Sequence, residues 1–476
     1  QDQQRLILRS ERIAGGILPR VLSSFDMITI FVTIVLWIVN AAVVTGAGPA
    51  AYIYWLLGLV TFLIPGAIVT GQLGLMFPGE GSVYIWTTKA FGSFMGFLAG
   101  FCAWWPGILV LISASDAVVT LIQNLGHLYH LSLLSDSGSQ GLVIILIITI
   151  SFLLSILRFR LTQNLVNMIF LAYGSTVILI GMAGLLWLLS GHASYTDLSF
   201  QTGKWSLNEG NFTFYGTVIL ALLGIEVPLN MGVEIKDIRS ITRYLIWGSV
   251  VVMAAYLIVT FGVMIAVPAG DQANLAAVVE AIQKGWGPAG LFLATIANLF
   301  LIGFFVFVAT VYNYSFARLI FVSGLDRRLP VVMSKINANK VPWIAMLVQS
   351  AIAALLSTII FVFAPFVFST ENVANILYEI LQAATSVIWC ISMVILFIDV
   401  LTIRYKFQEL FERIRLVPDW IFVLCSIVGT LASACGVYVT FISPWTNTPG
   451  NTVLSTIQWD TWLAGIAVVS LIVAVV

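Results

Sequence analysis

The sequence predicts an all-α membrane protein with twelve transmembrane helices and both termini in the cytoplasm. The first reason is composition: 60% of the 476 residues are hydrophobic and only 9% are charged, with a mean hydropathy of +1.04. So few charges cannot cover the surface of a water-soluble domain. The second is the length of the apolar runs, and the third is the uneven distribution of basic residues between them.

The apolar runs are continuous in Leu, Ile, Val, Phe and Ala, so helices are expected rather than the short alternating strands of a β-barrel. About 20 residues are needed to cross the hydrocarbon core. Twelve runs reach this length, approximately at 26–48, 50–73, 92–124, 140–158, 164–190, 212–234, 243–267, 288–322, 342–366, 372–400, 417–442 and 460–476.

The spans divide the chain into four parts, none of which includes a separate soluble domain. A hydrophilic segment, 1–25, precedes the first five spans (26–190). The next five spans occupy 212–400, and the last two occupy 417–476. The connections between the spans are too short to build a core of their own, so function must reside within the helix bundle.

Basic residues give the orientation. Of the 21 Lys and Arg, 19 lie before the first span or after an even-numbered one, and only Lys204 and Lys284 lie on the other side. By the positive-inside rule both termini are cytoplasmic. We expect no cleavable signal peptide, because the first residues are polar and the first apolar run is too long. The four cysteines fall within predicted spans, which favours buried thiols over disulfides.

Several functional classes are excluded by what the sequence lacks. The formal charge is zero, so nothing indicates a nucleic-acid partner. All three histidines fall in predicted external loops, and no catalytic or metal-binding motif lies at membrane depth, so we predict no enzyme, no cofactor and no metal. A channel would carry rings of charge or a pore signature. Polar residues in interrupted helices instead favour a secondary transporter in the cell membrane.

The sixth span contains the most unusual stretch, GIEVPLNMGVEIKD, which begins at Gly224. Pro228 cannot donate to the helix ladder, and Gly224 leaves its backbone bare. Glu226, near mid-span, is costly in hydrocarbon unless it is protonated, paired or facing a wet cavity. One interpretation is a broken helix in which the backbone, Ile225 included, and a titratable carboxyl bind substrate. The other is a simple kink with an interhelical hydrogen bond from Glu226.

Three motifs resemble those of the amino acid–polyamine–organocation permeases. FPGEGSVYIWTTKAFGSFMGFLAG (77–100) is similar to the pattern that opens their third helix. ARLIFVSGLDRRLP (317–330) is similar to their loop after helix eight, and GIEVPLNMGVEIK (224–236) to their sixth helix. The motifs occur in the family's order and spacing, and the resemblance covers essentially the whole chain.

Within this superfamily the chain most resembles the glutamate/GABA antiporter branch, through the stretches 62–86, 224–235 and 325–350. The resemblance implies a fold of five plus five helices in inverted repeats, with helices 1 and 6 broken at the centre and helices 11 and 12 outside. It also implies exchange of an amino acid for a related amine. It places Arg318, with Asp326, Arg327 and Arg328, in a cytoplasmic loop.

Two departures from the family pattern affect the expected mechanism. Most permeases have a glycine-rich triplet in helix one that binds the substrate carboxylate, whereas TIVLWIVNAA (33–42) has no glycine, and β-branched side chains crowd backbone donors. By position alone, the candidates there are Val35, Leu36, Val39 and Asn40. Phe170 occupies the place of a helix-five lysine that proton-coupled relatives use, so exchange without obligatory ion coupling is the simplest reading.

Other polar residues within the spans are candidates with a structural alternative. Asp116 could carry a proton, like Glu226, or bond a neighbouring serine. Trp104 could gate the pocket or pack. Tyr378, Gln382 and Thr385 recur at helical spacing and could face the substrate path or bond neighbouring helices.

Two functional hypotheses follow. The first is an antiporter that exchanges amino acids or amines by alternating access. The second is a non-transporting sensor or partner-dependent member, which the glycine-free helix one would favour. The expected partners are the lipid bilayer and an amino acid or amine, neutral or cationic because no Lys or Arg is expected at membrane depth. The sequence gives no prediction of oligomeric state.

Overall fold

The computed structural model describes residues 7–200, 203–367, 373–443 and 456–475. Within these ranges every regular element is helical, apart from two isolated β-bridges. The main helices are α2 (Arg9–Ile17), α3 (Ser24–Val35), α4 (Ile38–Val44), α5 (Ala50–Gly58), α6 (Ile64–Met76), α7 (Ser82–Phe91), α8 (Ser93–Leu128), α9 (Ser137–Ser155), α10 (Phe159–Leu189), α11 (Thr213–Ala221), α12 (Arg239–Ala266), α13 (Leu275–Gly285), α14 (Gly290–Leu325), α15 (Trp343–Ser357), α16 (Ala364–Val367), α17 (Val373–Lys406), α18 (Gln408–Arg413), α19 (Asp419–Ile442) and α20 (Thr456–Val475).

Shorter turns connect or interrupt these helices. Two π-helical turns continue helices across their middle, η2 (Leu59–Leu63) between α5 and α6 and η8 (Thr358–Phe363) between α15 and α16. The 3₁₀ turns are η1 (Thr45–Ala47), η3 (Val227–Asn230), η4 (Gly232–Glu234), η5 (Ala269–Asp271), η6 (Gly287–Ala289) and η7 (Val331–Ser334).

The described helices include ten that are long and apolar enough to cross a membrane, and α3 with α4 forms an eleventh candidate that is bent by 41°. Each of the ten overlaps one predicted apolar run, and the bent pair occupies the first run. In the sixth run α11 has nine residues and the chain then leaves the helical path. All four cysteines are free, as expected.

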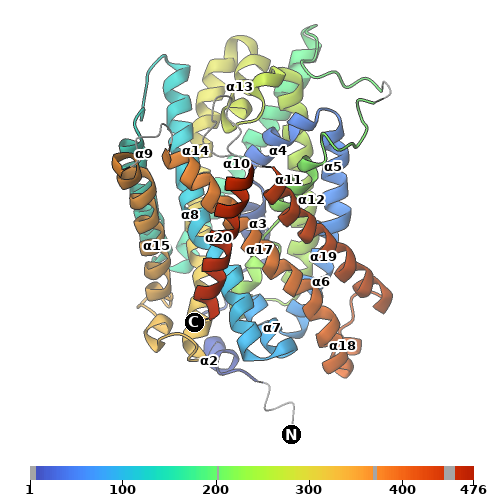
Figure 1. Ribbon diagram of the computed structural model, residues 1–476, viewed down its shortest axis with the longest axis vertical. Coiled ribbons are helices and arrows are strands. Elements are labelled where there is room, and N and C mark those ends of the chain that lie inside the picture. Colours follow the sequence, from blue (N-terminus) through green and yellow to red (C-terminus); the bar gives the residue numbers. More distant parts are fainter. Residues whose placement is uncertain (1–6, 201–202, 368–372, 444–455, 476) are drawn as a thin grey trace.

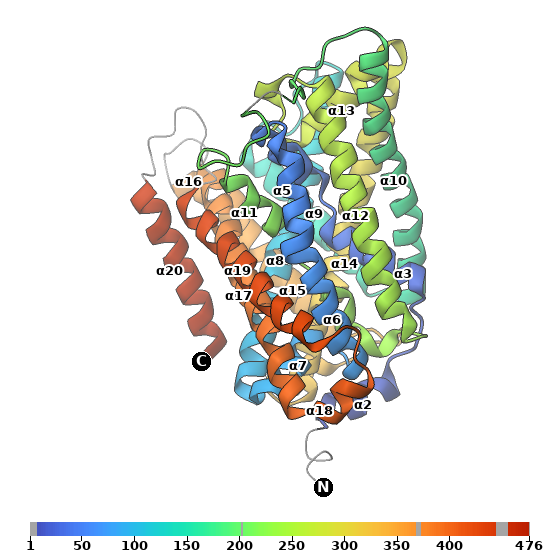
Figure 2. The same ribbon diagram turned by 90° about the vertical axis from the view of Figure 1, so that its right-hand side faces the viewer.

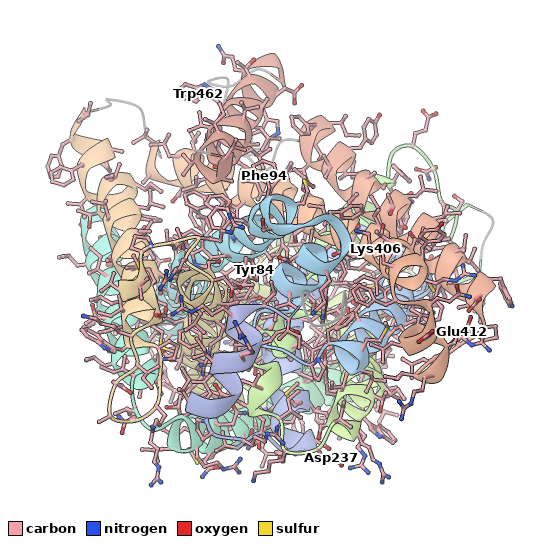
Figure 3. All side chains as sticks on the ribbon, turned by 90° about the horizontal axis from the view of Figure 1, so that it is seen from below. Tyr84, Phe94, Asp237, Lys406, Glu412 and Trp462 are labelled. Atoms are coloured by element: carbon pink, nitrogen blue, oxygen red, sulfur yellow. The ribbon has the colours of Figure 1, made fainter. Side chains whose placement is uncertain are left out.

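The two ends of the bundle carry different elements (Figures 1 and 2). We call them the α13 end, where α13 and the connection after α10 lie, and the α7 end, where α2, α7 and α18 lie. The last described turn of α20 points toward the α7 end as well. Seen from that end, Tyr84 lies near the middle of the face, whereas Asp237 and Glu412 lie near its rim (Figure 3).

Helix α3, which opens the first apolar run, begins where the sequence supplies a cap and a charge partner. Ser23 and Asp26 form a capping box at the start of α3, which satisfies free backbone amides. The buried Asp26 carboxylate also accepts from Arg160 and Asn167 of α10, each at 2.6 Å. These bonds fix the start of α3 against α10 and leave its apolar remainder for the core.

One expectation from the sequence is wrong. Arg318 does not lie in a loop: α14 continues to Leu325, and the Arg318 side chain is fully buried within it. The helix ends at Leu325, and Arg327, two residues further on, has a left-handed backbone with φ of 58°. Arg318 is tolerated inside because two carboxylates face it.

The helix at the C-terminal end of the described chain is peripheral. In Figure 2, α20 stands apart from the bundle at its edge. It packs mainly on α17, where Trp459 and Leu463 form a small apolar cluster with Ile376 and Ile380. The functional centre therefore lies elsewhere, among α3, α4, α8, α11, α14 and α17.

Candidate functional site

The first discontinuity lies between α3 and α4. Helix α3 ends at Val35 and α4 begins at Ile38, so that Leu36 and Trp37 have non-helical backbones. Neither glycine nor proline occurs at this point. The local sequence therefore does not account for the break, and tertiary contacts must stabilise it.

Three tyrosine hydroxyls provide those contacts. Three successive carbonyl groups that the break releases from the helix ladder each accept a hydrogen bond from a buried tyrosine on a different helix. The pairs are Tyr312 to the Ile34 oxygen (2.7 Å), Tyr256 to the Val35 oxygen (2.6 Å) and Tyr173 to the Leu36 oxygen (2.8 Å). Because a buried carbonyl without a partner is costly, these hydroxyls make the interrupted backbone stable at this depth.

The second discontinuity follows α11, as the sequence predicts. Helix α11 ends at Ala221, and regular structure resumes only in η3, which contains Pro228. Gly224 has φ of +106°, a conformation that side chains rarely adopt. A β-carbon at Gly224 would lie 2.6 Å from Ile34. The two interrupted segments therefore touch directly.

Glu226 lies within the second discontinuity and is 1% exposed. Its Oε1 accepts a hydrogen bond from the indole nitrogen of Trp389 on α17 at 3.2 Å. Among the described residues its Oε2 has no partner. The interhelical hydrogen bond of the structural interpretation is thus present, and one carboxyl oxygen is still free to bind a proton or a ligand.

A cavity of about 570 Å³ lies where the two discontinuities meet. It reaches from the end of α3 toward the α13 end, where the exposed Ala273 contributes to its lining. Helices α4, α8, α11, α14 and α17 form its walls. Its volume is in the range typical of small-molecule sites, so the cavity is the candidate functional site.

The structure brings five of the predicted residues into the cavity lining: Val35, Val39, Asn40, Gln382 and Thr385. Gly224, Ile225, Glu226 and Pro228 do not line it. Gly224 and Glu226 lie directly behind it, because a β-carbon at Gly224 would lie 3.3 Å from Trp389 of the wall and Trp389 donates to Glu226. Ile225 and Pro228 are buried in the same segment.

Four other predicted residues also lie outside the lining. The Leu36 side chain is buried in the core. Trp104 donates to Gln349 of α15 at 2.9 Å, and Tyr378 packs against Phe361. Asp116 follows the lining residue Ser113 by one helical turn on α8.

Sequence reasoning missed the aromatic part of the wall. Trp37, Tyr312 and Trp389 all line the cavity. Trp389 could have been found, because it continues the stripe of Gln382 and Thr385 by one more turn of α17. Polar side chains missed at the wall are Ser113, Thr213, Thr217, Ser386 and Ser443.

The chemistry of the wall is polar and aromatic but uncharged. No Asp, Glu, Lys or Arg of the described chain lines the cavity. Amide and hydroxyl groups such as those of Asn40 and Gln382 can both donate and accept, and aromatic faces attract cations. The wall therefore suits a small molecule that is neutral overall or positively charged.

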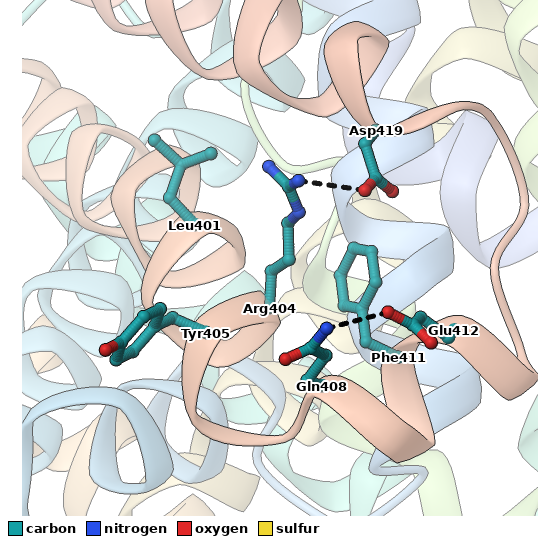
Figure 4. A pocket seen from close by; sticks show the side chains of 7 residues that line it. All are labelled: Leu401, Arg404, Tyr405, Gln408, Phe411, Glu412 and Asp419. Atoms are coloured by element: carbon teal, nitrogen blue, oxygen red, sulfur yellow. Dashed lines mark hydrogen bonds and ion pairs between the residues drawn. The ribbon is translucent and has the colours of Figure 1, made fainter.

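Two smaller cavities lie at the α7 end. One of about 350 Å³ lies among α17, α18 and α19, and its polar groups pair with one another: Arg404 with Asp419 at 2.8 Å and Gln408 with Glu412 at 2.9 Å (Figure 4). The other, of about 280 Å³, includes Glu11, Arg20 and Lys236. Neither shares a lining residue with the central cavity.

The chain matches one protein family along nearly its whole length. The family model described as amino acid permease matches residues 22–473. A probable agmatine/putrescine antiporter of Lactococcus lactis is 26% identical over 59% of this chain and 59% of its own length. A probable GABA permease of Pseudomonas aeruginosa is 24% identical over 73% of this chain and 74% of its own. An uncharacterized transporter of Legionella pneumophila is 22% identical over 89% and 90%.

A solved structure shares the fold. A mutant of the manganese transporter of Eremococcus coleocola superposes with a TM-score of 0.60, covers 95% of this chain and 94% of its own, and is 13% identical. At that identity the likeness concerns the fold alone.

Proposed function

Because the chain belongs to the amino acid permease family, we propose that it exchanges amino acids or amines across the cell membrane by alternating access, with the central cavity as its substrate site. The family and its relatives are transporters and not enzymes, and the chain is a multi-pass membrane protein. The observation that carries the proposal is the cavity at the contact between two interrupted helices. Such breaks at the bilayer midplane are where transporters bind their cargo.

The proposed architecture has twelve crossings. The bent pair of α3 and α4 would be the first, and α11 with the segment through η4 the sixth. Residues 26–190 and 212–400 would be the inverted repeats, with α19 and α20 outside them. The α7 end would face the cytoplasm, because Lys204 and Lys284 lie on the connection after α10 and on α13, at the opposite end.

The proposed substrate is an amine or an amino acid without excess negative charge. The uncharged wall offers no cation to a carboxylate, and an unpaired charge in a low-dielectric site is expensive. The names of two relatives, an agmatine/putrescine antiporter and a GABA permease, support this class. The substrate would contact Asn40, Gln382, Thr385 and the indole of Trp389.

Glu226 is the proposed proton carrier. Its free oxygen and its hydrogen bond to Trp389 of the cavity wall support this role. Asp116, one turn along α8 from the cavity wall, is the second candidate.

Counterflow tests the proposal. Proteoliposomes preloaded with agmatine, putrescine, GABA or arginine should accumulate the labelled form of the matching substrate. Thermal unfolding of the purified protein with the same compounds gives an independent measure, because a ligand that binds the folded state raises its apparent stability. Stabilisation without exchange would favour the alternative function, a non-transporting sensor. That function is also compatible with a first break whose carbonyl groups are already bonded to tyrosines.

A further inference from the structure

Three charged side chains are buried together on the α7 side of the cavity. Arg318 of α14 lies between Glu80, in the connection of α6 and α7, and Glu234, at the end of η4. Its guanidinium nitrogens are 3.4 Å from the Glu80 Oε1 and 2.5 Å from the Glu234 Oε1. The exposed fractions of the three side chains are 0%, 0% and 1%. We call these residues the charge triad.

The triad has one positive charge for two carboxyl groups. Among the described residues, its charged neighbours do not supply a second cation, because each is engaged with another group or lies at the surface. Lys89 pairs with Glu11, and Arg160 pairs with Asp26. The Asp326 carboxylate accepts hydrogen bonds from Ser10 and Tyr84, and the Tyr314 hydroxyl donates to Gln163. Arg20 and Lys236 line the smaller cavity at the α7 end.

Protonation of one carboxyl resolves this imbalance. With both glutamates ionised, the triad would hold an uncompensated negative charge in a dry site, which is strongly unfavourable. With one proton bound, the site is neutral: Arg318 faces one carboxylate and one carboxylic acid. Coupled groups of this kind bind the proton as a unit rather than as separate residues.

The triad also lies in the layer of backbone segments between the central cavity and the α7 end. The peptide groups of Val21 and Leu22, before α3, donate to the Glu234 carbonyl at 2.8 and 2.9 Å. The Gly81 amide, next to Glu80, donates to the Asn230 carbonyl at 3.0 Å. Three segments from distant parts of the chain therefore meet in one layer, and Arg318 fastens this layer to α14.

We propose that Glu80 and Glu234 hold one shared proton while they face Arg318, and that this layer opens toward the α7 side with release of that proton. The inference rests on the proposed function, because alternating access requires this layer to part. When Glu234 moves away from Arg318 into water, each carboxyl is again solvated or singly paired. The reason for the proton then disappears.

The expected pH response follows from the environment of Glu80, which lies outside the membrane-spanning helices. Burial raises the pKa of Glu80 well above its ordinary value; Arg318 lowers it, and Glu234 raises it further. A raised pKa in the closed form means that the proton stabilises this form at low pH, and that the stabilisation is lost as the pH rises through the raised value. Alkaline conditions on the α7 side should therefore favour opening.

Infrared spectroscopy of the purified protein tests the proton directly. The wild type should show the carbonyl band of a buried carboxylic acid that titrates with pH. E80Q and E234Q should each lose the titrating component of this band that E226Q retains, because one carboxylate then matches one guanidinium. The control is D399N, which removes a buried carboxylate that accepts from Thr87 at 2.6 Å outside the triad. Retention in both triad variants of the component that E226Q keeps would overturn the shared proton.

The opening of this layer is tested in proteoliposomes in which only the pH on the α7 side is varied. Wild-type exchange should slow as this pH falls, by up to about tenfold per unit, because one proton is released. E80Q and E234Q should flatten the profile, and D399N should not. If one triad variant does not fold, the other decides the result. If exchange does not depend on this pH while the infrared band is present, the proposed opening of the layer with proton release is wrong. If no protein exchanges substrate, the proposed function is refuted. The infrared result then still decides whether the triad holds a proton.

Discussion

The indole of Trp389 on α17 donates a hydrogen bond to the buried carboxylate of Glu226, which lies in the break after α11. Trp389 also lines the central cavity. Under the proposed function, a cargo molecule in contact with the indole would change the surroundings of the carboxylate, and protonation of the carboxylate would change the position of the indole. This contact connects the wall of the cavity to a titratable group directly behind it.

Replacing Glu226 with Gln tests this connection. The amide oxygen can still accept from Trp389, so the fold should be retained, but the side chain can no longer bind or release a proton. We expect the pH profile of exchange to shift or disappear while expression and melting temperature stay near wild type. Counterflow measured across a pH series provides the readout. An unchanged profile would mean that Glu226 is only a structural acceptor.

Thr385→Ala tests the cavity wall. Both Thr385 and Thr358 donate to the carbonyl one turn earlier in their own helices at 2.8 Å, but only Thr385 lines the cavity. Loss of a hydrogen bond to substrate costs about 0.5–1.5 kcal/mol, so T385A should weaken binding about two- to tenfold. T358A is the matched control and should bind normally in the same thermal-shift titration. Equal affinities in the two variants would place the substrate elsewhere.

Tyr256→Phe tests the first break. The Tyr256 hydroxyl donates to the Val35 carbonyl and also lies 3.2 Å from the Trp37 amide, which donates to it. Removing it leaves the Val35 carbonyl and the Trp37 amide only their own 3.2 Å bond and takes the hydroxyl donor from the Ala221 carbonyl, at a cost of about 1–3 kcal/mol. The unfolding midpoint in denaturant should therefore fall. Y129F, which removes an exposed hydroxyl bonded to Thr295, should have little effect, and similar losses in both variants would argue against a special role for the break.

Gly224→Ala tests the second break. Its backbone conformation costs a non-glycine residue about 1–2 kcal/mol, and the new methyl group would collide with Ile34. Both transport and thermal stability should decrease. Gly174, in helix α10, has open space at the corresponding position, so G174A should stabilise the protein by about 0.5–1 kcal/mol. A neutral G224A would show that the break tolerates rearrangement.

The sequence predicts the spans well because the thickness of the hydrocarbon core forces each apolar run to a minimum length. It also predicts the second break, because Gly224 and Pro228 act locally on the backbone. The first break leaves no local signal. It depends on Tyr173, Tyr256 and Tyr312, which are 137 to 278 positions away from the carbonyls they bind.

The site was predictable in part for a similar reason. Gln382 and Thr385 repeat at helical spacing, so one face of α17 could be identified from the sequence. The charge triad could not, because Arg318 sits in an apolar run, while Glu80 lies in a distant connection and Glu234 at the end of a different run. A buried ion pair is defined by three-dimensional proximity, which no spacing along the chain records.

Because three phenols bind consecutive peptide oxygens, the short stretch between α3 and α4 should move as one unit. Helices α10, α12 and α14 each hold one point of the same short stretch, so displacing any one of them strains the bonds to the other two. A partial displacement of one helix would break these hydrogen bonds before new ones could form. Motion at this place should consequently be all-or-none, giving discrete occupancy of two arrangements instead of a continuum of intermediate ones.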